Sequence, residues 1–482
     1  MSFRFVDHSD INHKARKLIR SHVMKGKNSG KTRAKRDENP KPAADKPAIA
    51  CRTVNVPRGN DIPITTLGHP QSNSAFLAVT RQIANNLDLV SPTKIAPQAM
   101  LHLQQLAFYI LDISSPPVFC QTTGVTGWMW FQLAFRDEAY FHCNVAIASA
   151  CAAFLTEDSY HSPVALYHMS QAYRLVNQRL SSNEALSDNT IAVVAAINIY
   201  DRLYSDPHRA MIHLNGVTRM IALRGGIGEL AKRKFLIAEK ALRCDMELAL
   251  HCGSKPKYSS GDVPRHLVLI SQRDHLGPQT RESMRVLESI LYQSVCVELR
   301  EAVFDTLSLS RILSQASHAQ KLDPEAYQGT LIYVCYRLLE NQLHHNESSV
   351  SASFDMLVQM ALFGFLITFC FGIGRKLITF PLVMERFRSV GRAACGDGRP
   401  QKMVLFWALL MGRVSSLTNG DDVVWLVPRL KALADALELR AWRDVSDALR
   451  GFPWVKAAHE VPGEEFWNMA LALPLPCKPI ES

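Results

Sequence analysis

Residues 186–226 read LSDNTIAVVAAINIYDRLYSDPHRAMIHLNGVTRMIALRGG, and this stretch decides what fold we expect. Apolar residues recur every three or four positions in both halves, at 191, 194 and 197 and again at 211, 214, 217 and 221. This spacing places them on one face of each of two helices. Asp206 and Pro207 lie between the halves. The stretch therefore predicts a helical hairpin.

The ends of both predicted helices carry capping residues. Ser187 or Asp188 can cap the first helix by accepting one of its unpaired N–H groups. Asp206 can cap the second, and Pro207 suits its first turn because no hydrogen bond is lost there. Gly225 and Gly226 predict the end of the second helix, since a left-handed backbone is cheap only for glycine.

Gly216 lies inside the second predicted helix. A glycine there costs about 1 kcal/mol relative to alanine, so we expect a close helix–helix contact to require it.

Two polar positions of the hairpin invite a structural hypothesis. His213 is expected to be a core histidine held by a carbonyl or a carboxylate. Arg224 precedes the two glycines, and Asp245 lies one predicted helix later. We expect Arg224 and Asp245 to form an ion pair that locks two helices together. We expect His213, Arg224 and Asp245 to be structural rather than ligand-binding.

Helical periodicity continues outward from the hairpin, while strand-like alternation is almost absent, so the fold class is all-α. At 482 residues, the chain exceeds the ~250–300 at which a single core stops growing. We expect a large irregular helical bundle or array over residues 76–482, either as one domain or as two lobes. A stretch rich in Gly, Pro and Ser marks the candidate lobe boundary at 253–282. The main predicted helical segments are 101–113, 131–155, 163–180, 188–204, 285–410 with a break at 391–400, and 421–450.

Residues 356–373, MLVQMALFGFLITFCFGI, are about long enough to cross a bilayer. Charged residues follow within a few turns, and the rest of the chain consists of amphipathic helices. We therefore expect a central buried helix and no membrane association.

The N-terminal region has a different composition. Residues 14–36 hold ten Lys and Arg and no Asp or Glu, which equals the whole formal net charge of +10. We expect residues 1–75 to be a disordered basic arm and linker. Its partner would be DNA phosphate, a nuclear-import receptor or an acidic membrane surface, or the arm would be a solvated tail without a partner. The cations assigned to DNA contact or import are Arg16, Lys17, Arg20, Lys25, Lys27, Lys31, Arg33, Lys35 and Arg36.

The hairpin resembles the regulatory domain of the fungal-specific transcription factors. The similarity rests on residues 213–226 (HLNGVTRMIALRGG), on Arg243–Asp245, on the aromatic run from Trp442 to Trp467, and on an N-terminal stretch around residues 21–23. Within this resemblance, the structural motif residues are His213, Gly216, Arg224, Gly225, Gly226 and Asp245. The resemblance implies an all-helical body, a nuclear location, protein partners and a homodimer.

The sequence departs from this family in one respect. The binuclear zinc cluster needs six closely spaced cysteines, because two metal ions share thiolate ligands. Cys51 is the only cysteine before residue 100, so residues 1–99 do not contain that module. We expect a regulator's body without its own zinc cluster.

Catalytic and metal-binding motifs are not recognisable, so we expect no enzyme activity, cofactor or metal. The sequence contains no GxSxG, HExxH or GxxxxGK[ST] pattern. The adjacent pairs His142–Cys143 and His344–His345 point about 100° apart on a helix, which disfavours a shared metal. His161 and His168 are separated by Pro163, which disfavours a common helix face.

Three hypotheses of function remain. The first is a nuclear transcription regulator that acts through protein contacts, with the arm serving import and non-specific contact to DNA phosphates. The second is a helical scaffold or corepressor without DNA binding. The third is a small-molecule sensor or an enzyme with a pocket between helices.

Overall fold

The computed structural model describes residues 92–121, 132–156, 162–204, 206–270, 288–318, 320–341, 350–370 and 379–473. These residues form helices and connecting segments, with no strand among them, which confirms the all-α class. The predicted arm lies outside the described residues. The helices are α3 (Pro97–Ser114), α5 (Glu138–Thr156), α6 (Pro163–Leu180), α7 (Asp188–Leu203), α8 (Pro207–Leu223), α9 (Ile227–Arg233), α10 (Phe235–Cys252), α13 (Ile290–Ser294), α14 (Val297–His318), α15 (Pro324–Glu340), α16 (Val350–Cys370), α17 (Pro381–Ala393), α18 (Arg399–Val414), α19 (Val423–Leu437), α20 (Trp442–Ala448) and α21 (Lys456–Ala472). Short 3₁₀ turns are η2 (Ser260–Asp262), η3 (Arg265–Leu267), η4 (Gly420–Asp422) and η5 (Leu449–Gly451).

Local sequence explains where several helices begin. Helices α6, α8 and α15 each begin with proline, and each is preceded by a Ser or Asp whose side chain accepts a backbone N–H of the first turn. The cap satisfies one of the unpaired N–H groups, and proline lacks the N–H that would otherwise be unpaired. The predicted helix over 131–155 is interrupted at Asp137, whose carboxylate accepts the N–H of Tyr140 at 2.9 Å. A new helix, α5, therefore starts at residue 138.

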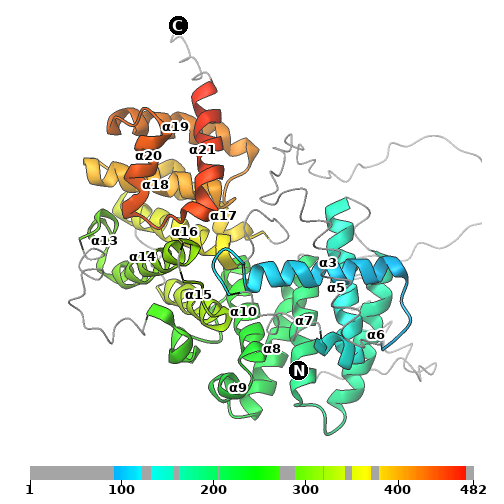
Figure 1. The fold of residues 1–482 in the computed structure, drawn as a ribbon. Helices are drawn as coiled ribbons and strands as arrows, with labels where there is room; N and C mark the ends of the chain where they lie inside the picture. Colours follow the sequence, from blue (N-terminus) through cyan, green and yellow to red (C-terminus); the bar gives the residue numbers. More distant parts are fainter. Residues whose placement is uncertain are drawn as a thin grey trace, which may run out of the picture. The chain divides into compact units, whose positions relative to one another are not determined.

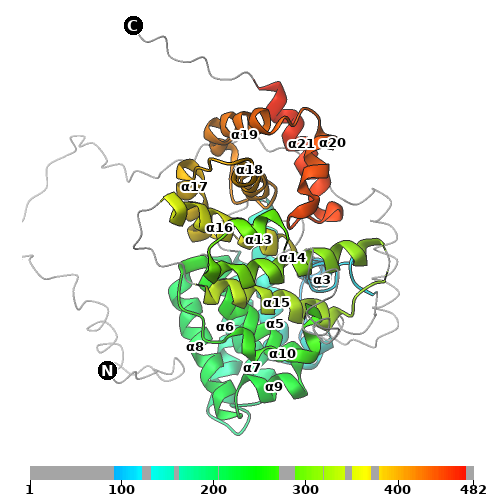
Figure 2. The same ribbon diagram turned by 90° about the vertical axis from the view of Figure 1, so that its left-hand side faces the viewer.

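Helix α10 links the earlier helices to the later ones. It contacts α7, α8 and α9, which precede it in the sequence, and α15 and α17, which follow it (Figures 1 and 2). Helix α16 packs against α15, α17 and α18, and α18 packs against α19 and α21. The buried side chains of these helices belong to one continuous hydrophobic cluster.

Helix α16 contains most of the apolar run that begins at residue 356. By length and composition, Ser353–Cys370 could cross a membrane, yet 83% of this window is buried inside the protein. Phe365, Leu366 and Phe369 are almost fully buried. The prediction of a central buried helix is confirmed.

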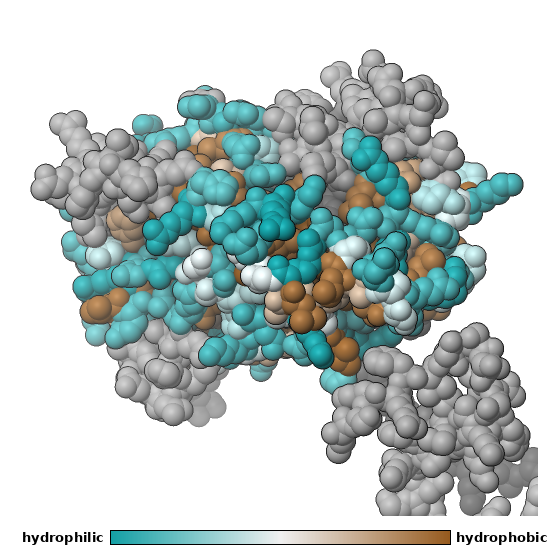
Figure 3. Space-filling model, turned by 90° about the horizontal axis from the view of Figure 1, so that it is seen from below, coloured by the Kyte–Doolittle hydropathy of each residue, from teal (hydrophilic) through white to brown (hydrophobic). Residues whose placement is uncertain are grey.

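The surface differs from this interior. On the face seen in Figure 3, polar residues dominate and apolar residues form only small patches among them. Exposed apolar side chains include Tyr167, Ile212 and Leu223. Scattered apolar residues of this kind are normal on a protein surface.

The region of the proposed lobe boundary is described for residues 253–270, and residues 271–287 lie outside the described residues. The turns η2 and η3 within it pack against α15. The division into two lobes stays a prediction.

Candidate functional site

The α7–α8 hairpin has the ends that its sequence predicted. Ser187 caps α7 by accepting the N–H of Thr190 at 3.2 Å, and Asp206 caps α8 by accepting the N–H of Arg209 at 3.0 Å. After α8, Gly225 and Gly226 have φ values of +95° and +94°. Residues with a Cβ atom rarely adopt this backbone conformation, so glycine is required at both positions where the chain turns toward α9.

Gly216 does not mediate a close contact. A methyl group built at its Cα would meet no atom within 4 Å. The predicted requirement for glycine at this helix contact is therefore wrong. Nothing in the structure explains the glycine at this position.

His213 is held by a carboxylate, as predicted, but its side chain is partly exposed and does not lie in the core. Its Nδ1 lies 2.6 Å from Oδ2 of Asp201 on α7, and the Asp201 side chain is almost fully buried. The ring of Tyr173 on α6 stacks against the imidazole, with 6.0 Å between ring centroids. The contact connects α6, α7 and α8, which is a structural role.

The predicted ion pair between Arg224 and Asp245 is wrong. Arg224 pairs instead with Asp188, the first residue of α7, and both side chains are partly exposed. Arg224 is the C-cap of α8 and Asp188 opens α7, so this pair joins the two open ends of the hairpin. This pair was within reach of the sequence, because an antiparallel hairpin brings the start of its first helix close to the end of its second.

Asp245 on α10 anchors the segment that follows its helix. Its carboxylate accepts the backbone N–H groups of Lys257, at 2.9 Å, and of Tyr258, at 3.1 Å. It also accepts the hydroxyl of Tyr336 on α15, at 2.9 Å. Burial raises the pKa of Asp245, although these hydrogen bonds act in the opposite direction. Asp245 therefore connects α10, α15 and the loop before η2.

A buried chain of charged residues, which the sequence did not predict, connects α7, α10, α15 and α16. Arg202 on α7 pairs with Glu247 on α10, whose other oxygen lies 3.5 Å from Arg243. Arg243 donates to the side chain of Gln328, at 2.8 Å, and to the backbone carbonyl of Cys370. Burial acts to lower the pKa of Arg243, but Glu247 and Glu239 raise it overall. The only sequence signal was that Arg243 belonged to the family-like pair with Asp245.

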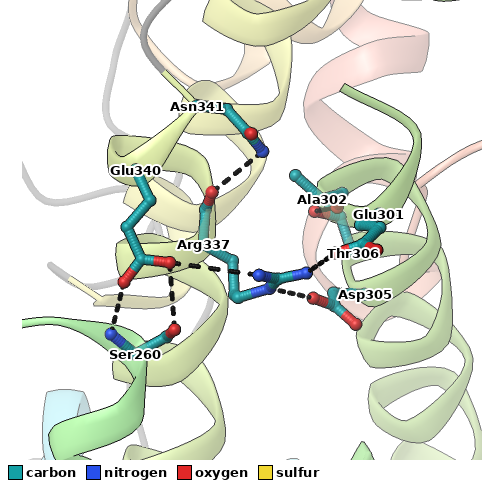
Figure 4. Close-up of polar contacts among 8 residues, drawn as sticks. All are labelled: Ser260, Glu301, Ala302, Asp305, Thr306, Arg337, Glu340 and Asn341. Atoms are coloured by element: carbon teal, nitrogen blue, oxygen red, sulfur yellow. Dashed lines mark hydrogen bonds and ion pairs between the residues drawn. The ribbon is translucent and has the colours of Figure 1, made fainter. Parts of the chain in front are cut away.

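A further polar cluster ties α15 to α14 and to the predicted boundary region (Figure 4). Arg337 on α15 pairs with Glu301 and, at 3.1 Å, with Asp305, both on α14. One turn further along α15, Glu340 accepts the N–H and the hydroxyl of Ser260 in η2, at 2.6 and 3.0 Å. Residues 259–262 are thus held against the helical body.

Two buried histidines form a contact that the sequence did not predict. His142 on α5 and His168 on α6 lie 2.7 Å apart, measured between their Nδ1 atoms. Burial and the neighbouring His142 lower the pKa of His168 to about 4. Within the described ranges, no group of three or more His, Cys, Asp or Glu side chains is arranged to hold a metal ion.

A pocket of about 240 Å³ lies among α10, α15, α16 and α17. Its walls combine apolar residues, such as Leu250 and Phe363, with the polar side chains of Asn341 and Gln359, and Arg386 supplies a cation. It is smaller than the roughly 300–1,000 Å³ of most small-molecule sites. The charged residues of the contacts described above, such as Asp188, Arg243 and Glu247, do not line this pocket.

The predicted import and DNA-contact residues lie outside the described residues. The geometry of the motif residues His213, Arg224 and Asp245 supports a structural role, because each pairs with a charged side chain or backbone groups of neighbouring elements.

Comparison with known proteins identifies the region that contains Arg202, Arg243 and Glu247 of the buried charged chain. The model of the fungal specific transcription factor domain matches residues 128–248, which run from just before α5 to near the end of α10. No curated protein and no solved structure matches the chain. The match indicates a role in transcription regulation. The resemblance drawn from the hairpin is therefore confirmed over residues 128–248, the part of the chain that matches the fungal specific transcription factor domain.

Proposed function

We propose that this protein is a nuclear transcription regulator whose helical body binds other proteins and whose basic arm serves nuclear import. The family match over residues 128–248 is the observation that carries this proposal. The family gives no indication of catalysis.

The arm adds a second, separable part of the proposal. Ten cations without an intervening carboxylate repel one another and attract polyanions. We propose that the segment Lys31–Arg36 forms the core of the import signal and that the arm contacts DNA phosphates without reading sequence. Such contacts release counterions, so affinity should fall steeply with salt.

The test of the arm uses full-length protein in a gel shift at several salt concentrations. In the arm variant, four cations are replaced by glutamine: Lys31, Arg33, Lys35 and Arg36. We expect weaker binding and a salt slope that is less negative by about 0.9 for each lost phosphate contact. The same substitutions in a fluorescently tagged chain should reduce nuclear accumulation.

A matched control removes the same number of charges from exposed positions of the helical body: Lys232, Arg233, Lys255 and Arg440. We expect this variant to bind and localise as the unaltered chain does. Equal loss in both variants would show that the arm has no special role. Nuclear import without any gel shift would favour the scaffold or corepressor function instead.

The regulatory role itself is tested by chromatin immunoprecipitation of the tagged, full-length protein. Occupancy at discrete loci is expected. Uniform background across the genome, together with nuclear localisation, would contradict a regulator that acts at chromatin.

A further inference from the structure

A second pocket, of about 380 Å³, lies where α14 meets the segment from Ser446 to Lys456. Its volume is within the roughly 300–1,000 Å³ of small-molecule sites. The two sides are joined by a hydrogen bond, in which the backbone N–H of Trp454 donates to Oγ of Ser310 on α14 at 3.0 Å. The pocket is therefore part of the packed body.

The permanently charged side chains that line this pocket are all cations. Arg311 comes from α14, Arg450 comes from η5, and Lys456 is the first residue of α21, while His318 of α14 and several serines also line the pocket. None of the described residues that line the pocket is Asp or Glu. Cationic side chains from three separate elements thus converge on one cavity.

Two carboxylates near this lining are already engaged. Asp447 pairs with Arg450 at 2.6 Å, and both side chains are largely exposed, so solvent screens this pair. Glu460 accepts hydrogen bonds from the hydroxyl of Ser446, at 2.7 Å, and from the indole N–H of Trp454, at 3.2 Å. Among the described residues, Lys456 has no ion pair. The pocket therefore keeps a net positive character.

The remaining lining supplies an apolar wall and hydroxyl groups. Leu307, Phe452 and Trp454 are buried and form the apolar part of the lining, and Ser310, Ser314 and Ser317 of α14 also line the pocket. Lys456 also opens α21, a helix of 17 residues whose N-cap, Val455, offers no side-chain acceptor. The partial positive charge of that helix end adds to the charge of the cations.

We propose that this pocket binds a small organic anion, with a phosphate or carboxylate group held by Lys456 and Arg450 and an apolar body against Phe452 and Trp454. Arg and Lys bind either anionic group by charge-assisted hydrogen bonds. The proposal goes beyond the regulatory function and does not depend on the arm. It gives the helical body a ligand class to which it could respond.

Isothermal titration calorimetry on the full-length protein tests the proposal. The probes are phenyl phosphate, benzoate, inorganic phosphate and the neutral benzyl alcohol. We expect saturable binding of phenyl phosphate or benzoate, and the tighter of the two identifies the preferred anionic group. Inorganic phosphate should bind more weakly than phenyl phosphate because it lacks the apolar body, and benzyl alcohol should bind most weakly because it lacks the charge.

The variants are Lys456→Gln and Arg450→Gln, each at an exposed position, so folding should be preserved. Each should weaken binding at least about tenfold, the loss expected for one charge-assisted hydrogen bond. Arg440→Gln is the matched control, since Arg440 also pairs with an exposed Asp but does not line the pocket. Unchanged affinity in both pocket variants, an equal loss in the control, benzyl alcohol binding as tightly as the anions, or no saturable anion binding would each overturn the proposal.

Discussion

Replacing Asp245 by alanine should destabilise the protein clearly, for a reason different from the one that its sequence suggested. The carboxylate accepts two backbone N–H groups, from Lys257 and Tyr258, and the hydroxyl of Tyr336. Alanine leaves the two backbone N–H groups without this acceptor, while the Tyr336 hydroxyl keeps the carbonyl oxygen of Leu242, at 3.0 Å. The loop before η2 should therefore detach from α10.

The size of the effect follows from these contacts. Each hydrogen bond to a charged group contributes about 1.5–3 kcal/mol. The raised pKa of Asp245 shows that burial of the carboxylate offsets part of this gain. We expect Asp245→Ala to lower the free energy of unfolding by about 3 kcal/mol.

Thermal unfolding and hydrogen–deuterium exchange both test this prediction. The melting temperature should fall, and the amides of Lys257 and Tyr258 should exchange faster, because both lose their acceptor. The control is Asp188→Ala, which removes the partly exposed partner of Arg224 and should cost no more than about 1 kcal/mol.

A double-mutant cycle separates the two pairings of Arg224. Arg224→Ala and Asp245→Ala should be additive to within about 0.5 kcal/mol, because the two side chains do not contact each other. Arg224→Ala and Asp188→Ala should show coupling. A coupling above about 1 kcal/mol between Arg224 and Asp245, or no change in amide exchange in Asp245→Ala, would refute this reasoning.

Three further predictions concern stability. Burial raises the pKa of Glu239 from 4.5 to about 7, so the free energy of unfolding should fall as pH rises through that range. Glu239→Gln should therefore raise the free energy of unfolding at pH 8 by up to about 3 kcal/mol and change it little at pH 4. An equal effect at both pH values in urea unfolding would contradict this prediction. Gly216→Ala should stabilise by up to about 1 kcal/mol, whereas Gly225→Ala, at φ +95°, should destabilise by a similar amount or more, and thermal melts that ranked them in the opposite order would count against both assignments. The pKa of His168 is lowered from 6.5 to about 4, so the free energy of unfolding should fall as pH falls from 6.5 toward 4. His168→Gln should flatten that part of the curve of stability against pH. A curve that this substitution leaves unchanged would exclude His168 as the cause.

Local features of the sequence were sufficient to predict the helices and several of their ends. A capping side chain acts on N–H groups two or three residues away, as Ser187 and Asp206 do, and the glycines after α8 act through their own φ angles. The apolar run of α16 likewise predicted a buried helix from composition alone. The carboxylate partner of His213 lies within the same hairpin, so this contact was also within reach of local reasoning.

The partners of the charged residues, in contrast, were decided by the tertiary structure. Asp245 reaches a hydroxyl 91 positions later in the chain, and Arg243 reaches a carbonyl 127 positions later. The histidine pair and the cationic pocket likewise join separate helices. Helix periodicity states which face of a helix is buried but not which other helix covers it, because that choice depends on how side chains pack across the whole core. The amino-acid sequence alone therefore determined the helical class and the hairpin, while the packing of α10 against α7 and α15 decided which polar and charged side chains meet.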